Sequence, residues 1–203
     1  MVTEVTVNVD SSYITISNWS YTVCSDNGWY WVEIPHDYPN GEYTQQLTVD
    51  VDVDSFIYDR YQISNFSDYY NYSVEISVTG TIGWSSGNFC TYFPNQSYAD
   101  KLYNSYIDID GYTTYLIEGM TQRTQTLNIG SASSCVITGC LNYADGTYTN
   151  GYYALVMSAI QAKITFSPRC SISNVIANPN YDSTTGKITA SPSYSSSHCY
   201  DID

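Results

Sequence analysis

The chain has 203 residues, and its 20 acidic residues outnumber its 6 lysines and arginines, which gives a formal net charge of −14 at pH 7. A protein that binds a phosphate backbone needs a basic surface, so the charge argues against nucleic acid as a partner. No apolar stretch reaches the length of about 18 residues that a membrane-spanning helix needs. Only 13% of the residues are charged while 23 are tyrosines, so hydroxyl and amide groups must keep the protein in solution.

The first predicted strand lies in MVTEVTVNV, where Val5, Val7 and Val9 alternate with polar residues. Alternation with a period of two predicts a half-buried strand. A terminal strand can pair within its own sheet, or a neighbouring subunit can receive it, which builds head-to-tail filaments. The stretch lacks the basic and apolar regions of a signal peptide. Either the protein is made without one or the printed sequence begins at a processed or recombinant end, and the cysteines favour the second.

Trp29 and Trp31 alternate with Tyr30 in the next predicted strand, residues 29–34. Neighbouring residues of a strand point to opposite faces, so the two tryptophans share one face. Exposed rings can stack on sugars or form subunit contacts, whereas buried rings pack in the core. All three roles stay open.

Asp50, Asp52 and Asp54 alternate with valines at the end of the predicted strand 46–53. On a strand these carboxylates share one face at a spacing of about 7 Å. The pattern resembles the start of an EF-hand loop, but Ser55 stands where that loop needs glycine. One interpretation is a calcium site completed by a second loop. The other is a solvated strand face that discourages edge-to-edge aggregation.

Segments rich in β-branched and aromatic residues predict further strands, at 74–78, 112–118, 123–129, 134–142 and 163–167. Five dipeptides are typical of tight hairpin turns: Asn27-Gly28, Asn40-Gly41, Asp110-Gly111, Asp145-Gly146 and Asn150-Gly151.

Helix is predicted for few residues. The candidates are 98–106 and 152–162, and the second segment can equally be a long buried strand. We therefore predict an all-β protein, an antiparallel sandwich or barrel-like domain, without distinguishing a jelly roll from an immunoglobulin-like fold. The composition becomes polar and turn-rich near Arg169, so residues 1–168 are predicted as the main domain. Residues 169–203 are predicted as a small appended sheet or arm.

Six cysteines are spread along the chain, at Cys24, Cys90, Cys135, Cys140, Cys170 and Cys199. Their spacing and the two scattered histidines, His36 and His198, do not form a zinc set. An even number of cysteines fits three disulfides, and reduced core thiols are the alternative. Cys135 and Cys140 bracket a segment that Gly139 could turn, and Cys170 could hold the C-terminal segment through Cys199.

Four asparagines occupy N-x-[ST] sites that can accept a glycan, Asn18, Asn65, Asn71 and Asn95. The composition predicts about four such sites by chance, so their number is no argument for glycosylation. Asn65 and Asn71 flank a polar turn in NFSDYYNYS and are the first candidates for glycans if the cysteines are bridged.

No pattern of a nucleophile, a base and an orienting acid occurs, so we predict a protein that is not an enzyme. The main hypothesis is an extracellular structural protein: a subunit of a surface filament, sheath or virion, assembled through its first strand and aromatic interfaces as a homo-oligomer. The alternative is a secreted carbohydrate-binding or adhesin module that uses Trp29 and Trp31. A β-pore-forming toxin is a third hypothesis, from the alternation of serine and threonine in 121–134. No cofactor is expected apart from the candidate calcium ion.

Overall fold

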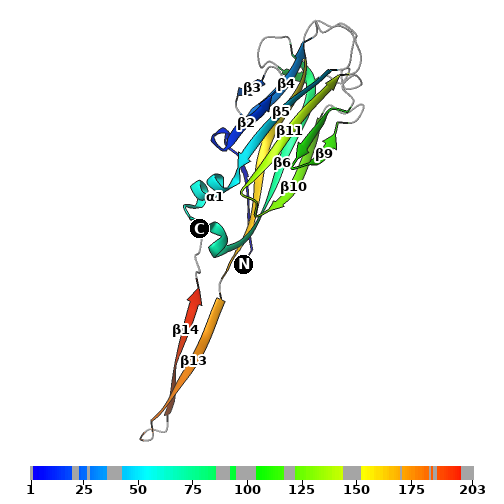
Figure 1. The fold of residues 1–203 in the computed structure, drawn as a ribbon. Helices are drawn as coiled ribbons and strands as arrows, with labels where there is room; N and C mark the ends of the chain where they lie inside the picture. Colours follow the sequence, from blue (N-terminus) through cyan, green and yellow to red (C-terminus); the bar gives the residue numbers. More distant parts are fainter. Residues whose placement is uncertain are drawn as a thin grey trace.

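The computed structural model describes residues 2–19, 23–26, 28–35, 43–85, 92–94, 104–116, 122–143, 152–169, 171–182, 184 and 187–197. Most of these residues lie in antiparallel strands, and helices are few and short (Figure 1). The two larger sheets face each other, which confirms the predicted all-β sandwich. None of the helices in the described ranges is long and apolar enough to span a membrane.

The first sheet has seven strands and is built around the long strand β12 (Tyr152–Pro168). One edge of β12 pairs with β6 (Tyr70–Ser85) at both ends of the strand, with a shift of register between Ser158 and Gln161. Strand β6 also pairs with β10 (Gln122–Gly130) and β7 (Tyr92–Pro94). The other edge of β12 pairs with β4 (Trp29–Pro35) and β1 (Thr3–Asn8). Strand β3 (Val23–Asp26) pairs with β4. The segment 152–162 is therefore the long strand, and the helix alternative for it is wrong.

The second sheet has five strands in the order β2 (Ile14–Trp19), β5 (Tyr43–Asp52), β11 (Ser134–Tyr143), β8 (Tyr106–Ile109) and β9 (Tyr112–Tyr115). Asp110 and Gly111 join β8 to β9 with positive φ angles of 49° and 85°, as a tight hairpin turn requires, so this predicted turn is confirmed. Gly28, with φ of 78°, lies between β3 and β4. The other three predicted turns lie outside the described residues. Of the predicted helix 98–106, Tyr106 begins β8 and residues 98–103 are not described.

The core lies between the two sheets and is made by every second residue of the strands, the residues whose side chains point inward. Val74, Ile76 and Val78 of β6 are fully buried. Two glycines let the sheets approach closely: a Cβ atom at Gly80 would lie 2.7 Å from Cγ2 of Ile107 in the facing sheet. A Cβ atom at Gly139 would lie 3.0 Å from Sδ of Met157. Large side chains of one sheet thus fill the space over a glycine of the other.

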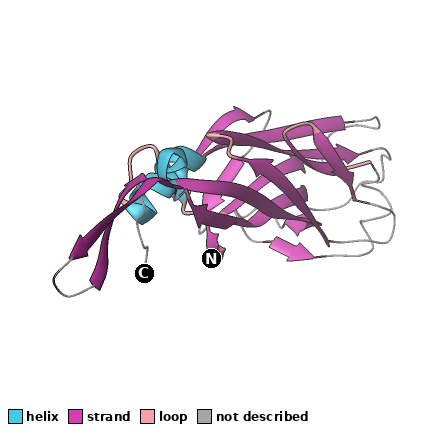
Figure 2. Cartoon of the chain, turned by 90° about the horizontal axis from the view of Figure 1, so that it is seen from below, coloured by secondary structure: helices cyan, strands magenta, loops and turns pink. Residues whose placement is uncertain are grey.

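One end of the sandwich is covered by α1 (Val53–Tyr61) and α2 (Phe66–Tyr69), and Figure 2 shows these helices near the base of the C-terminal hairpin. The ring of Phe66 stacks on Tyr70 and Tyr61, with centroids 4.6 and 5.1 Å apart, and lies edge-on to Phe166 at 5.7 Å. The aromatic residues of NFSDYYNYS therefore belong largely to a packed cluster. Their role is to close the end of the core.

The C-terminal segment forms a hairpin of β13 (Ser171–Asp182) and β14 (Lys187–Ser197). Within the described residues these two strands pair only with each other. The hairpin extends away from the sandwich (Figure 1). The division into a domain of residues 1–168 and an arm of residues 169–203 stays a prediction.

Candidate functional site

The outer edge of β12 is shared by two strands that do not meet. Residues 152–157 of β12 pair with β4, and residues 161–166 pair with β1. Residues 158–160 lie between these two partners, and the register with β6 shifts between Ser158 and Gln161. Val9 fastens the end of this interval, because its N–H donates to the carbonyl of Ile160 at 2.9 Å.

Ala159 occupies the left-handed region in the middle of this interval, with φ of 49°. For a residue with a Cβ atom this conformation costs about 1–2 kcal/mol. Bulges and strained backbone positions concentrate beside binding sites, so Ala159 marks this edge as a candidate.

A groove opens at the interrupted edge, with a volume of about 1030 Å³. It combines segments that are distant in the sequence: the end of β1, the 3-10 turn Ser11–Tyr13, β2, the start of β4 and the bulge of β12. The lining residues are Asn8, Val9, Asp10, Ser11, Ile14, Thr15, Ile16, Gly28, Trp29, Tyr30, Ser158, Ala159 and Ile160. We call this site the Trp29 groove.

Trp29 is the large aromatic residue that the groove exposes. Its side chain is 46% exposed, whereas the following residue, Tyr30, is only 3% exposed and packs in the core. This is the alternation expected of a strand, and it places the indole of Trp29 on the surface. Trp31 belongs to the same strand, but its side chain lies outside the described residues.

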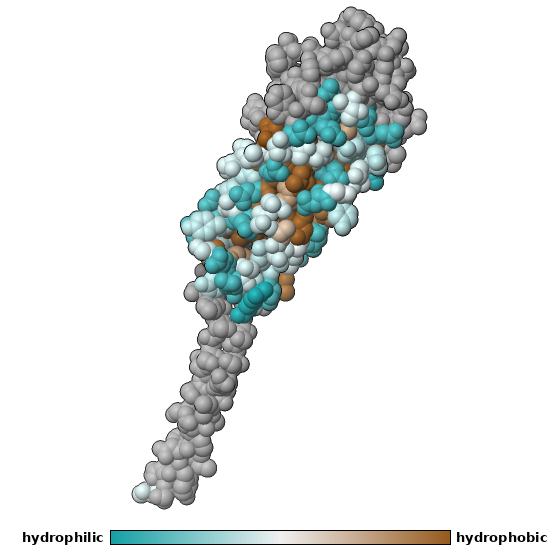
Figure 3. All heavy atoms as spheres, in the orientation of Figure 1, coloured by the Kyte–Doolittle hydropathy of each residue, from teal (hydrophilic) through white to brown (hydrophobic). Residues whose placement is uncertain are grey.

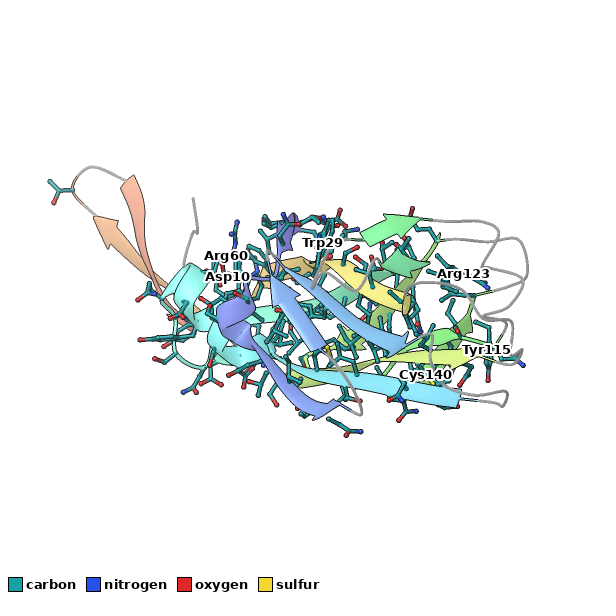
Figure 4. The ribbon with its side chains drawn as sticks, turned by 90° about the horizontal axis from the view of Figure 1, so that it is seen from above. Asp10, Trp29, Arg60, Tyr115, Arg123 and Cys140 are labelled. Carbon is teal, nitrogen blue, oxygen red and sulfur yellow. The ribbon has the colours of Figure 1, made fainter. Side chains whose placement is uncertain are left out.

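Polar side chains of the groove are held in place by local hydrogen bonds. Oδ1 of Asn8 accepts from Nε2 of Gln161 at 2.9 Å. Oδ1 of Asp10 accepts from the N–H of Ser12 at 2.9 Å, and this bond lowers the pKa of Asp10 below its ordinary value. Figure 4 shows Asp10 and Trp29 well away from the end of the sandwich that carries Tyr115 and Cys140. The groove thus offers an ionised carboxylate, an amide and hydroxyls beside an aromatic ring.

A second group of exposed aromatic residues lies on the β8–β9 hairpin. Tyr112 and Tyr115 are 64% and 51% exposed. The ring of Tyr115 lies edge-on to Tyr106 at 5.7 Å, and the Tyr106 hydroxyl accepts from Nε2 of Gln46 at 3.3 Å. The sequence places Tyr112 and Tyr115 on a strand but does not select them as surface residues. The described part of the face seen in Figure 3 is mostly hydrophilic, with apolar residues showing in its middle.

The three aspartates of the predicted calcium site do not share one strand face, and a site completed by another loop stays a prediction. Strand β5 ends at Asp52, whose Oδ1 accepts from the N–H of Ser55 at 3.0 Å and caps α1. Asp54 follows in the first turn of that helix, so Asp50, Asp52 and Asp54 do not form the row that a continuing strand would give. Within the described ranges, no group of three histidine, cysteine or acidic residues could hold a metal ion.

The predicted disulfides are wrong for Cys135 and Cys140, which are buried free thiols. Both lie on the uninterrupted strand β11, so Gly139 does not turn the chain. Five residues of strand span about 16 Å, whereas a disulfide needs Cα atoms within about 7 Å. Burial raises the pKa of Cys135 to about 12. The side chain of Cys24 and all of Cys90, Cys170 and Cys199 lie outside the described residues.

The predicted donor strand pairs within its own chain. Residues 3–8 form β1 on the edge of β12, and Val5 and Val7 pack half-buried against the core, with Val9 buried beyond them. The structure therefore shows the intramolecular alternative, in which β1 pairs with residues 161–166 at the edge of β12.

The glycan acceptor sites are described at three of their four positions. Asn18, Asn65 and Asn71 are exposed, and Oδ1 of Asn71 accepts from Nε of Arg169 at 2.8 Å. Asn95 lies outside the described residues. Whether any of these sites carries a glycan stays a prediction.

Comparisons with known proteins add little. No protein-family model and no curated protein matches the sequence. Among solved structures, the chain is similar to CBM86, a low-affinity xylan-binding module from the gut symbiont Roseburia intestinalis. The identity is 12%, the match covers 82% of this chain and 96% of that chain, and the TM-score is 0.31. This similarity is too weak to assign a function.

Proposed function

We propose that the protein is a carbohydrate-binding module that holds a glycan in the Trp29 groove. The observation that carries the proposal is a half-exposed tryptophan in a groove lined by amide, hydroxyl and carboxylate groups. The apolar face of a sugar ring stacks on an indole, and its hydroxyls need polar partners around that ring.

The size and fixation of the groove support this proposal. Its volume of about 1030 Å³ is at the upper end of small-ligand sites and suits several sugar units. Trp29 lies on a strand, and Asn8 and Asp10 are held by hydrogen bonds to neighbouring groups. Side chains fixed before binding lose little freedom on binding, which favours affinity.

We propose that the Trp29 groove binds a glycan without cleaving it. Glycoside hydrolysis commonly needs two carboxyl groups on either side of the scissile bond. Among the described residues that line the groove, Asp10 carries the single carboxylate. The non-enzymatic role stays part of the proposal, as does a secreted or surface location, where the protein would meet glycans. The two free cysteines lend no support to that location.

The proposal is tested by calorimetric titration of the protein with a panel of soluble polysaccharides. The variant Trp29→Ala should lose about tenfold in affinity for the glycan that binds, because the stacking contact is removed. Tyr115→Ala is the matched control, since it removes a ring of similar exposure at the other end of the sandwich (Figure 4). Unchanged binding by Trp29→Ala, or no binding of any glycan, would rule the proposal out.

A role in assembly is a second candidate, favoured by the C-terminal hairpin. A two-stranded hairpin is at best marginally stable by itself, so a hairpin that extends from the sandwich is suited to a partner surface. Light scattering of the whole protein should then show oligomers, and deletion of residues 171–197 should give monomers with an unchanged sandwich melting temperature. A whole protein that stays monomeric at high concentration would exclude this role.

A further inference from the structure

We propose that the Trp29 groove prefers glycans that carry a protonated amine, such as oligomers of glucosamine, over neutral and acidic ones. This inference rests on the proposed carbohydrate-binding function. It specifies that the preferred glycan is positively charged. Three features of the described residues indicate this charge: the carboxylate of Asp10, the lack of a basic partner for it, and the indole of Trp29.

Asp10 supplies a negative charge that is exposed and available at the groove. One of its oxygens accepts from the N–H of Ser12, as the cap of the 3-10 turn. This bond leaves the carboxylate with remaining acceptor capacity. Hydrogen bonds from Ser12 also favour the ionised form and hold the pKa of Asp10 below its ordinary value.

The basic side chains that the structure describes are engaged elsewhere. Lys163 pairs with Glu4 at 3.4 Å, and the guanidinium of Arg60 lies over the ring of Tyr61 at 5.7 Å. Arg123 donates to the carbonyl of Tyr115, and Arg169 donates to Asn71. Among the described lining residues of the groove there is no lysine or arginine. A ligand cation therefore has no protein cation to compete with there.

Trp29 and the net charge act in the same direction as Asp10. A cation over the face of a tryptophan is attracted by the ring, and this attraction adds to the stacking of the sugar. The net charge of −14 attracts cationic ligands from a distance and repels uronate or sulfate groups. The groove thus offers an aromatic ring and a carboxylate to the same bound oligomer.

The test titrates three probes of equal length: an oligomer of glucosamine, one of N-acetylglucosamine and one of galacturonate. The glucosamine oligomer is used in a buffer that keeps its amine protonated. We expect it to bind about three- to fivefold more tightly than the N-acetylated oligomer at low salt, as exposed charge contacts allow. Salt at about 0.5 M should remove most of this advantage, because it screens exposed charges.

Asp10→Asn is the decisive variant. Asparagine keeps the oxygen that caps the 3-10 turn, so the local fold should persist, which circular dichroism and the melting temperature check. The advantage of the glucosamine oligomer should disappear, because loss of the charge weakens binding of the amine more than binding of the neutral N-acetylated oligomer. Asp68→Asn is the matched control, because it removes one exposed acidic charge from α2, outside the groove.

The outcomes separate the two proposals. Equal affinity for the amine and N-acetylated oligomers overturns the amine preference and leaves carbohydrate binding in place. An equal loss of the advantage in Asp10→Asn and Asp68→Asn shows a general charge effect and overturns the role of Asp10. Failure of every glycan in the panel, with the fold intact, overturns carbohydrate binding itself.

Discussion

The two edges of the sandwich differ in how completely their backbone groups are bonded. Where β9 faces β10, side chains of one sheet bind the backbone of the other: Nη1 of Arg123 donates to the carbonyl of Tyr115 at 2.7 Å, and Nε2 of Gln125 donates to that of Tyr112. Where β1 ends and β4 begins, residues 158–160 of β12 are left between two partner strands. The Trp29 groove lies at the second edge.

This contrast shows that the groove is a local construction and not a general property of sandwich edges. Unpaired edges invite association with other chains, and long polar side chains at the β9 edge reduce that hazard. At the β12 edge the bulge at Ala159 keeps the backbone out of regular pairing, and Trp29 stays on the surface. The edge whose side chains link the two sheets stabilises the fold. The edge that keeps a strained bulge leaves a groove in which a ligand can bind.

The closed edge is tested by the variant Gln125→Ala. Gln125 is only 6% exposed, and its loss leaves the carbonyl of Tyr112 without this donor. The free energy of unfolding should fall by about 1–2 kcal/mol, because this hydrogen bond is lost and truncation of a buried side chain leaves a void. Removal of the unpartnered Oε1 atom of Gln125 limits the loss. Urea unfolding measures the change. Gln122→Ala, an exposed position on the same strand, should have little effect, and an equal loss in both variants would contradict closure by Gln125.

Between the two edges, the buried thiol of Cys135 should make the free energy of unfolding depend on pH. Burial keeps its thiol protonated in the folded protein and raises its pKa from 9.0 to about 12. The unfolded chain loses this proton first, so the contribution to stability is complete below pH 9 and is lost between pH 9 and 12, by about 1.4 kcal/mol per pH unit. Urea unfolding across this pH range should show a shallower decline in Cys135→Ala. An identical slope in the two proteins would show that the thiol is not shielded.

The smallest effect tests the open edge through Ala159→Gly. Glycine adopts the left-handed conformation without strain, but it gains more freedom in the unfolded chain, so stability should rise by about 0.5–1 kcal/mol. Ala162→Gly is the control, because Ala162 is buried in regular pairing on the same strand and its loss should destabilise. Thermal unfolding measures both. A destabilised Ala159→Gly would mean that the bulge is not strained.

Much of the sandwich follows from local patterns, but α1 does not. The alternation in 46–53 predicts β5, yet the valine and aspartate pattern runs on past its end. Asp52 turns the chain by capping α1, whose buried residues Val53, Phe56 and Ile57 follow helical spacing. Two periods overlap in one short segment, and the sequence offers no means to choose between them.

The sequence by itself determined the all-β class, the hairpin at Asp110-Gly111 and the placement of Trp29 and Tyr30 on opposite faces of a strand, because these depend on a period of two and on the backbone freedom of glycine. The tertiary structure decided that the face of Trp29 is the outer one. Only the tertiary structure decided where β1 pairs, that Cys135 and Cys140 are apart, and that a groove exists. The groove unites residues near 10, 29 and 159, and its bulge is at an alanine, which no sequence pattern marks as left-handed. Such a site arises from the pairing of distant strands, and local propensity does not encode that pairing.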